Sequence, residues 1–214
     1  MNFKKITVAL LLFPVFAGCG NPGLKQPNME KETVIPSTAD TITLGAGCFW
    51  CTEAVYQQLN GVLSVTPGYS GGTTKNPTYR EVCTGLTGHA EVTQIIYDSA
   101  KISLAELLEV FWTAHDPTTL NRQGADEGTQ YRSVIFYHNG KQKETAEAYK
   151  KKLNDTKAFP NAVVTEISPL AVFYRAEDYH MDYYDKNGNA PYCRMVIAPK
   201  VEKVREVFKD KLKK

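Results

Sequence analysis

The chain has 214 residues, enough for one domain with a sizeable core and too few for two large domains. Hydrophobic residues make up 43% of the chain and charged residues 22%, so disorder of the whole chain is excluded. The formal net charge of +2 gives no electrostatic reason to expect a nucleic-acid partner. Lysines gather at 150–152 and within 200–214, where interleaved apolar residues indicate the solvated faces of helices.

The N-terminal segment is typical of a secretory signal. Lysines at positions 4 and 5 precede an apolar core over 6–16, and the segment is too short for a convincing transmembrane anchor. Phe16-Ala17-Gly18-Cys19 resembles the bacterial lipobox, whose cysteine becomes the lipidated first residue of the mature chain. We therefore predict a signal peptide over 1–18 and an acyl anchor on Cys19, which places the protein outside the cytoplasm on a bacterial membrane. The alternative is an ordinary secretory signal that happens to contain a cysteine.

The segment after Cys19 contains glycines, prolines and asparagines and has no apolar periodicity. Such a composition cannot bury a core, so residues 19–39 are predicted to form a flexible tether. The pattern changes at about Asp40, and residues 40–214 are predicted to form one domain.

The folded part begins with a predicted strand over 41–44. Gly45 and Gly47 indicate the turn that follows it. A helix is then predicted over 48–60, with its apolar residues along one stripe and its end before Gly61.

The stretch 67–89 is predicted to be irregular, and loops of this kind often carry function. Beyond it, strands are predicted over 90–97, 131–138 and 163–167, and helices over 104–115 and 141–153. Ser103 and Glu106 have the spacing of a capping box at the start of the first of these helices. Strands separated by helices favour an α/β or α+β two-layer domain.

Cys48 lies where a strand is followed by a helix. The amides at the start of a helix favour thiolate over thiol, so Cys48 is a candidate nucleophile. Cys51 follows one helical turn later, on the same side, where a disulfide with Cys48 is feasible. A zinc site is disfavoured because Cys83 and Cys193 are isolated in the sequence. A thioredoxin-like redox pair formed by Cys48 and Cys51 remains open. Two buried cysteines without chemistry are less consistent with export, because idle thiols outside the cytoplasm are liable to oxidation.

Two aromatic residues separate these cysteines. Phe49 and Trp50 offer large apolar surfaces that suit a small nonpolar group, such as a methyl group on sulfur. Aromatic residues at the start of a helix are equally typical of a core. Composition alone does not separate these two interpretations.

Several spaced motifs follow one another along the chain. They are Gly47-Cys48-Phe49-Trp50, Gly68-Tyr69-Ser70-Gly71-Gly72, Asn76-Pro77-Thr78-Tyr79, Gly88-His89-Ala90-Glu91, Asp126 with Gly128-Thr129-Gln130-Tyr131-Arg132-Ser133, the segment from Ala176 to Tyr183, and Tyr192-Cys193. In this order they resemble the peptide methionine sulfoxide reductase A family, over about 41–194. The resemblance implies a ferredoxin-like α/β two-layer sandwich on a mixed sheet, with Cys48 at the N-terminus of a helix at one edge of that sheet.

The resemblance also implies roles for the site residues. Cys48 is the implied nucleophile, Glu91 the implied proton donor, and Tyr79, Asp126 and Tyr131 accompany them. A sulfoxide has an electrophilic sulfur and a poor leaving oxygen, so attack by a thiolate requires that the oxygen be protonated or strongly hydrogen-bonded. A carboxyl group desolvated by aromatic neighbours has a raised pKa and can supply that proton. Without the resemblance, an exposed strand carboxylate is the simpler interpretation of Glu91.

Methionine then leaves Cys48 as a sulfenic acid, which a second thiol must resolve. Cys51 is one candidate, although this position is glycine in many members of the family. Cys193 is the other, because some members carry a resolving cysteine in their C-terminal segment. We expect Cys51 to act first and to pass the disulfide to Cys193. Cys83 and His89 are predicted to be structural.

The implied activity is the reduction of methionine S-sulfoxide in oxidised proteins, with free methionine sulfoxide as a further candidate substrate. Such an activity repairs proteins after oxidative stress. A thioredoxin-like dithiol protein is the expected reductant. No metal or organic cofactor, no nucleic acid and a monomeric state are expected.

Two other functions remain open at this stage. The main alternative is a thioredoxin-like disulfide reductase or isomerase that uses Cys48 and Cys51 on protein disulfides. Such an enzyme has no role for Glu91, Tyr79 or Tyr131. A lipid-anchored binding module with an aromatic recognition surface, and without turnover, is the third possibility.

Overall fold

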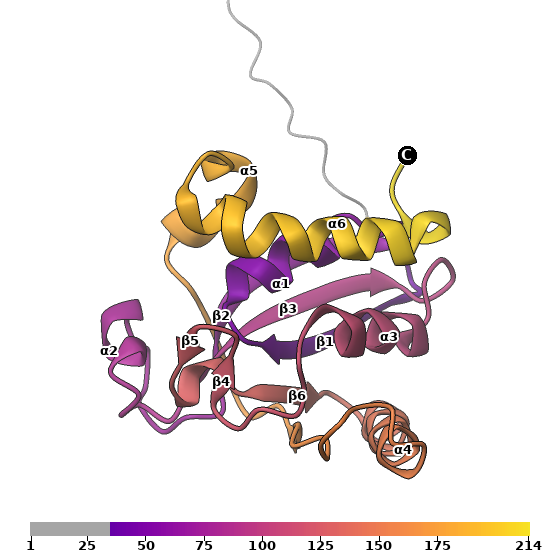
Figure 1. Cartoon of the computed structure of the whole chain (residues 1–214), viewed down its shortest axis with the longest axis horizontal. Helices are drawn as coiled ribbons and strands as arrows, with labels where there is room; N and C mark the ends of the chain where they lie inside the picture. The colour runs from indigo at the N-terminus through magenta and orange to yellow at the C-terminus, as the bar shows by residue number, and fades with distance from the viewer. Residues whose placement is uncertain (1–34) are drawn as a thin grey trace, which may run out of the picture. The chain divides into compact units, whose positions relative to one another are not determined.

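A computed structural model of the chain describes residues 35–214 (Figure 1). The predicted signal peptide, Cys19 and most of the predicted tether lie outside these residues. None of the helices between residues 35 and 214 is long and apolar enough to cross a membrane.

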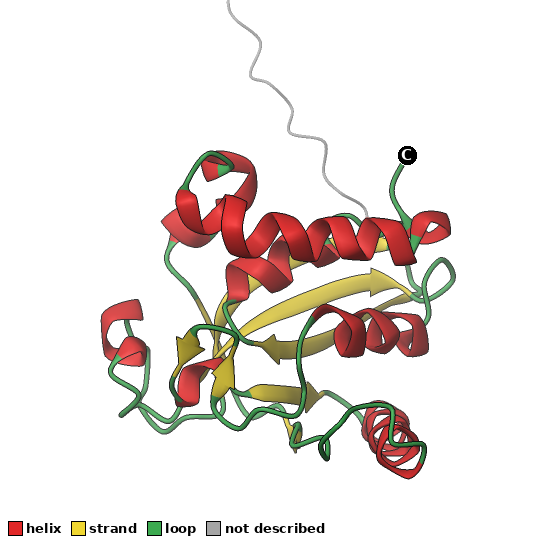
Figure 2. Cartoon of the chain, viewed as in Figure 1, coloured by secondary structure: helices red, strands yellow, loops and turns green. Residues whose placement is uncertain are grey.

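The core of the domain is a six-stranded sheet with the strand order β7-β6-β1-β3-β2-β8 (Figure 2). Strands β6 and β7 pair in parallel, and the other neighbours pair antiparallel. The predicted α/β fold on a mixed sheet is confirmed. The strands are β1 (Ala39–Ala46), β2 (Val62–Ser70), β3 (Ala90–Asp98), β6 (Ser133–Tyr137), β7 (Glu166–Pro169) and β8 (Phe173–Arg175), and β4 (Arg122–Gln123) pairs with β5 (Asp126–Glu127) in a separate ribbon.

The helices differ in how they contact the sheet and one another. α1 packs on β2 and β3, α3 packs on β1, α4 packs on β6 and β7, and α6 crosses α1 and α3 (Figure 1). The helices are α1 (Phe49–Tyr56), α2 (Tyr79–Cys83), α3 (Leu104–Ala114), α4 (Gly140–Asp155), α5 (Tyr183–Asn187) and α6 (Ala198–Val207), with short 3-10 turns η1 (Thr129–Tyr131), η2 (Asp178–His180) and η4 (Lys209–Lys211) and a π-helical turn η3 (Cys193–Ile197).

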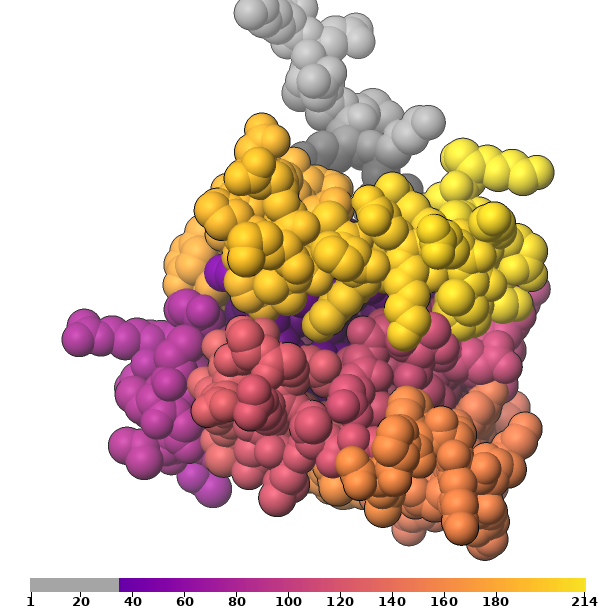
Figure 3. All heavy atoms as spheres, viewed as in Figure 1, coloured from indigo at the N-terminus to yellow at the C-terminus, as the bar shows by residue number. Residues whose placement is uncertain are grey.

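Helix α1 is enclosed on several sides. All of its residues except Trp50 are buried, whereas the sequence predicted a single apolar stripe. The difference arises because the C-terminal segment covers the remaining face. In the space-filling view this yellow segment hides most of the indigo start of the domain (Figure 3).

Strand alternation decides which face of the sheet each side chain meets. On β3, Ile95 and Tyr97 belong to the same buried cluster as α1, while Ala90 and Val92 belong to a smaller cluster on the opposite face. Because residues two apart point to the same side of a strand, Glu91 lies on the face covered by α1.

The prediction of an irregular stretch over 67–89 is wrong in part. Strand β2 continues to Ser70 and pairs with β3 through Pro67 and Gly68, two residues that usually punctuate a strand. A side chain at Gly68 would come within 2.4 Å of the ring of Phe173, so the close approach of β8 requires glycine there. Helix α2 lies in the same stretch, and its capping box of Thr78 and Glu81 was not anticipated.

Other predicted boundaries shift. Helix α1 ends at Tyr56, before the predicted end at about residue 60, because tighter turns follow it as far as Gly61. The last predicted strand, 163–167, forms three residues later as β7. Strand β1, which leads to Cys48, lies inside the sheet, so the implied place of this cysteine at a sheet edge is wrong.

Candidate active site

Cys48 is the residue that immediately precedes helix α1. Gly47 before it has a φ of +88°, and a side chain there would come within 2.6 Å of the Cβ of Gln123. Only glycine combines this left-handed conformation with so little space. The backbone therefore turns sharply at the end of β1 and places Cys48, which is 6% exposed, at the start of the helix.

The carboxyl group of Glu91 meets the same helix end. Its Oε2 accepts a hydrogen bond from the backbone N–H of Phe49 at 3.0 Å. Glu91 is 1% exposed, and this burial raises its pKa to about 8, although the bond from Phe49 opposes the rise. At neutral pH the side chain of Glu91 is therefore an uncharged acid next to Cys48. This is the protonation state that the implied role of proton donor requires.

The two thiols of α1 form a hydrogen-bonded pair. Burial raises the pKa of Cys48 well above its ordinary value, and the bond to Cys51 and the charge of Glu91 add to the rise. The bond from Cys48 lowers the pKa of Cys51 to about 7. The expectation that the helix end alone would favour the Cys48 thiolate is therefore wrong, because the Phe49 amide bonds Glu91 and the Cys48 side chain accepts no capping bond.

Two phenol groups accompany the carboxyl group. Burial, and then the charge of Glu91, raise the pKa of Tyr79 and of Tyr131. Both phenols therefore stay protonated and can donate hydrogen bonds. Tyr79 also lowers the pKa of the thiol of Cys83, which is exposed at the end of α2 and whose pKa is raised overall by burial.

Asp126 lies on β5 and reaches the thiols through a tyrosine. Its Oδ2 accepts a hydrogen bond from the hydroxyl of Tyr192 at 2.8 Å. Tyr192 also lies near Cys48 and Cys51 and lowers the pKa of both thiols. Tyr192 is therefore a site residue for which no role was predicted from the sequence.

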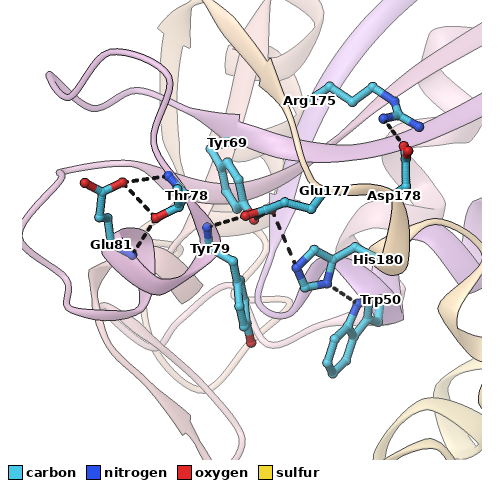
Figure 4. Close-up of polar contacts among 9 residues, drawn as sticks. All are labelled: Trp50, Tyr69, Thr78, Tyr79, Glu81, Arg175, Glu177, Asp178 and His180. Carbon is cyan, nitrogen blue, oxygen red and sulfur yellow. Dashed lines mark hydrogen bonds and ion pairs between the residues drawn. The ribbon is translucent and has the colours of Figure 1, made fainter.

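The aromatic residues Phe49 and Trp50 have different surroundings. Phe49 is 1% exposed, and its ring centroid lies 4.9 Å from that of His180. Trp50 is partly exposed and stacks on Tyr183 at 3.6 Å with an interplanar angle of 6°. Its Nε1 donates to Nδ1 of His180 at 3.1 Å (Figure 4). The structure thus places Phe49 in the core and leaves Trp50 as the aromatic surface that a ligand can meet.

Glu177 connects the start of α2 to the aromatic residues around His180. It accepts a hydrogen bond from the hydroxyl of Tyr69 and another from the backbone N–H of Tyr79, both at 2.8 Å (Figure 4). One of its oxygens lies 3.8 Å from Nε2 of His180, whose ring is fully buried. Tyr69, Glu177 and His180 had no assigned role, although each falls within a motif that resembled the family.

Cys193 and His89 are the remaining residues for which a role was predicted. Cys193 is buried in the π-helical turn, and burial, then the charge of Cys51, raise its pKa. His89 is structural, because its Nδ1 accepts from the N–H of Gly72 at 3.0 Å and its Nε2 lies 2.7 Å from the carbonyl oxygen of Thr74. Among residues 35–214, no cluster of three or more histidine, cysteine and acidic side chains is arranged to hold a metal ion.

A family model described as peptide methionine sulfoxide reductase matches residues 40–212 of the chain. The chain belongs to this family. Its activity is that of a peptide methionine sulfoxide reductase, so the predicted family and enzyme are confirmed.

Relatives of this reductase agree in sequence and in structure. Peptide methionine sulfoxide reductase MsrA of Saccharolobus solfataricus is 59% identical over 174 residues, which cover 81% of this chain and 97% of the relative. MsrA of Haloquadratum walsbyi is 58% identical, with 81% and 99% covered. Reduced Mxr1 from Saccharomyces cerevisiae superposes with a TM-score of 0.67 at 37% identity, and 74% of this chain and 91% of Mxr1 are covered. Methionine sulfoxide reductase A of Corynebacterium diphtheriae gives 0.65 at 37% identity, with 80% and 88% covered.

The buried acid predicts how the stability of the reductase depends on pH. The pKa of Glu91 is about 8 in the fold and about 4.3 in an unfolded chain, so the folded protein holds a proton that the unfolded chain has lost. This contribution is fully present below pH 4.3 and is lost as pH rises through 8. Between about pH 5 and pH 9 the unfolding free energy of wild type should therefore fall by about 3–4 kcal/mol relative to that of Glu91→Gln. Urea titrations of the two proteins measure this difference.

Glu53 offers the matched control. It is buried in α1, accepts hydrogen bonds from the N–H groups of Asp182 and Tyr183, and has its pKa raised by burial to about 7. The difference in unfolding free energy between Glu53→Gln and wild type should therefore stop growing at a pH about one unit lower than the corresponding difference for Glu91→Gln. A Glu91→Gln variant whose stability follows wild type at every pH contradicts the raised pKa.

Proposed function

We propose that this reductase converts methionine S-sulfoxide to methionine through a sulfenic acid on Cys48. The observation that carries the proposal is the uncharged carboxyl group of Glu91, fixed by the Phe49 amide at 3.0 Å beside the nucleophile. A sulfoxide oxygen is a poor leaving group, and a neutral acid at this point can protonate it. Thiol–disulfide exchange breaks no sulfur–oxygen bond, so it does not require this protonation.

The chemical step uses both thiols of α1. Proton transfer within the hydrogen-bonded pair brings the negative charge from Cys51 to Cys48, which attacks the sulfoxide sulfur. Glu91 gives its proton to the oxygen, and the phenols of Tyr79 and Tyr131 donate hydrogen bonds to it. The protonated oxygen then moves from the substrate sulfur to the Cys48 sulfur while the sulfur–sulfur bond formed by the attack breaks, so methionine leaves and Cys48 becomes a sulfenic acid. The substrate sulfur is reduced by two electrons and the Cys48 sulfur is oxidised by two.

The substrate methyl group is proposed to lie against Trp50. This ring is partly exposed, and its orientation is held by the stack on Tyr183 and the hydrogen bond to His180. Phe49 supports the site from the core. With the acid and phenols on one side and Trp50 on the other, the residues distinguish the oxygen from the methyl group, which supports selection of a single epimer, the S form.

Cys48 is proposed to be regenerated by a relay of thiols. The thiol of Cys51 hydrogen-bonds Cys48, and the charge of Cys51 acts in turn on buried Cys193. This order supports a first disulfide between Cys48 and Cys51, then its exchange to Cys51 and Cys193. A thioredoxin-like dithiol protein then reduces the last disulfide. Oxidised proteins are the proposed substrates, and the enzyme is proposed to act as a monomer.

The proposed mechanism is tested by incubating the enzyme with methionine S-sulfoxide, or a peptide that contains it, and dithiothreitol. Wild type should return methionine, and Cys48→Ser should return none. Glu91→Gln should lower kcat by roughly 10²–10⁴-fold, because the general acid is lost. The wild-type kcat should fall as pH rises above about 8, where Glu91 loses its proton.

Two outcomes would contradict this mechanism. Wild type that reduces insulin disulfides but no sulfoxide would favour the thioredoxin-like disulfide reductase. Wild type that binds the sulfoxide, yet gives no dimedone adduct on Cys48, would favour a binding module. The R epimer serves as the control substrate and should remain unreduced.

The thiol relay predicts how much methionine forms when no reductant is present. Wild type should form two methionines per enzyme, because exchange to Cys193 frees Cys48 for a second attack. Cys51→Ser and Cys193→Ser should each form one, and Cys51→Ser should also slow steady-state turnover with dithiothreitol. Quantifying methionine by chromatography gives the count. An unchanged steady-state rate for Cys51→Ser would assign the resolving role to Cys193.

A lipid anchor on Cys19, at the outer side of a bacterial membrane, is a further part of the proposal. It rests on the sequence Phe16-Ala17-Gly18-Cys19 after an apolar segment. The full chain, expressed in a bacterium, should incorporate labelled palmitate and partition into detergent.

Cys19→Ser should lose the label and the partitioning while the extract keeps its sulfoxide reductase activity. Cys83→Ser, which removes an exposed cysteine of the domain, is the control and should keep the label. Wild-type protein without label would leave an ordinary secretory signal as the better interpretation.

A further inference from the structure

A small cavity lies between helices α1, α3 and α6. Three polar side chains line it: Cys51 and Thr52 from α1 and Lys200 from the first turn of α6. The rest of its wall is mostly apolar and comes from β1, α1 and α3. The cavity therefore brings a thiol, a hydroxyl and an ammonium group together in largely apolar surroundings.

Two of these polar groups have no partner among the described residues. The hydroxyl of Thr52, which is 4% exposed as a residue, makes no hydrogen bond within residues 35–214. Lys200 forms no hydrogen bond or ion pair with another described residue, whereas Lys203, one turn later, donates to the carbonyl oxygen of Thr113 at 2.8 Å. Buried polar groups are rarely left unpaired, so the buried Thr52 hydroxyl, with the partly exposed Lys200 on the same cavity, indicates an acceptor that is present in only part of the reaction cycle.

The acceptor that fits is the thiolate of Cys51. Six titratable groups act on Cys51 from the elements around it: Cys48, Glu91, Asp126, Tyr192, Cys193 and Lys200. Lys200 is the cation in this set. Its charge lowers the pKa of Cys51 against the effect of burial, after the larger contribution of the Cys48 hydrogen bond.

None of the described groups around Lys200 forms an ion pair with it. His115, Asp116 and Lys203 line the outer surface pocket that Lys200 shares. Burial lowers the pKa of His115 to about 4, so it is neutral at pH 7, and the carboxylate of Asp116 is hydrogen-bonded to Thr118.

We propose that Lys200 is a positioning residue for the resolving step, in which its ammonium group and the hydroxyl of Thr52 stabilise the thiolate of Cys51. This inference rests on the proposed function, because it concerns the thiol that resolves the Cys48 sulfenic acid. In that step the Cys51 thiolate attacks the Cys48 sulfur and a sulfur–sulfur bond forms. The sulfur–oxygen bond of the sulfenic acid breaks, and its hydroxide leaves as water with a proton from solvent.

The test measures the titration of Cys51 and the rate at which it resolves the sulfenic acid. Thiolate absorbance of Cys51 is followed against pH in full chains that carry Cys19→Ser, Cys48→Ser, Cys83→Ser and Cys193→Ser. Adding Lys200→Met should move the midpoint up by about one pH unit, since a unit charge in a protein environment contributes on this scale. Lys200→Arg should restore the midpoint, and Thr52→Val should raise it by a smaller amount.

The kinetic arm uses chains with all natural cysteines and traps the Cys48 sulfenic acid with dimedone at successive times. Lys200→Met should slow its disappearance about two- to fivefold at pH 7, because fewer Cys51 thiols are ionised while each remaining thiolate is more nucleophilic. Above about pH 9 the slowing should vanish. A merely structural role of Lys200 would lower the rate at every pH and would not shift its midpoint.

Lys203→Met is the matched control, since it removes the same charge from the same helix and should leave both midpoints in place. Equal midpoints for Lys200→Met and Lys203→Met would overturn the inference. If wild type forms no sulfenic acid, the proposed function fails, while the absorbance titration still decides whether Lys200 acts on Cys51.

Discussion

The hydrogen bond from the Phe49 amide to Glu91 joins the start of the nucleophile helix to the middle of the sheet. It spans 3.0 Å and is buried, so water does not compete for either partner. Every group placed by α1 depends on it: Cys48 just before the bonded amide, Trp50 just after it, and Cys51 one turn later. The bond also fixes the orientation of a carboxyl group that has to stay neutral to be useful. This contact thus sets the geometry, while burial raises the pKa of the carboxyl group against the effect of the bond.

This arrangement changes how the thiol is activated. A helix end usually favours a thiolate through its free amides, but here the Phe49 amide serves the acid. Burial alone would make Cys48 a poor nucleophile, as its raised pKa indicates. The negative charge comes instead from the partner thiol of Cys51, and the hydroxyl of Tyr192, which contacts Asp126, favours the charged form of the thiols. Activation is therefore a property of a cluster and not of one residue.

The sequence was informative where chemistry follows from local order. Cys48 after a glycine turn, Cys51 one turn later and the capping box at Ser103 could all be read from spacing, and the motifs gave Glu91. Contacts between distant segments could not be read in this way. Tyr192 meets Asp126 across 66 positions of the chain, and no local pattern carries that pairing. The continuation of β2 through Pro67 was missed because tertiary pairing outweighed the local signals of a turn.

The cover that the C-terminal segment forms over α1 has a consequence during synthesis. Cys48 leaves the ribosome on the order of 10 s before Tyr192 and α6, at rates of roughly 5–20 residues per second. Until then the helix of the nucleophile has no outer cover and Trp50 has no stacking partner, because Tyr183 is also made late. The newborn enzyme therefore passes through an interval in which its catalytic thiols are not yet covered. The site is complete only when the C-terminal segment has been made and has packed on α1.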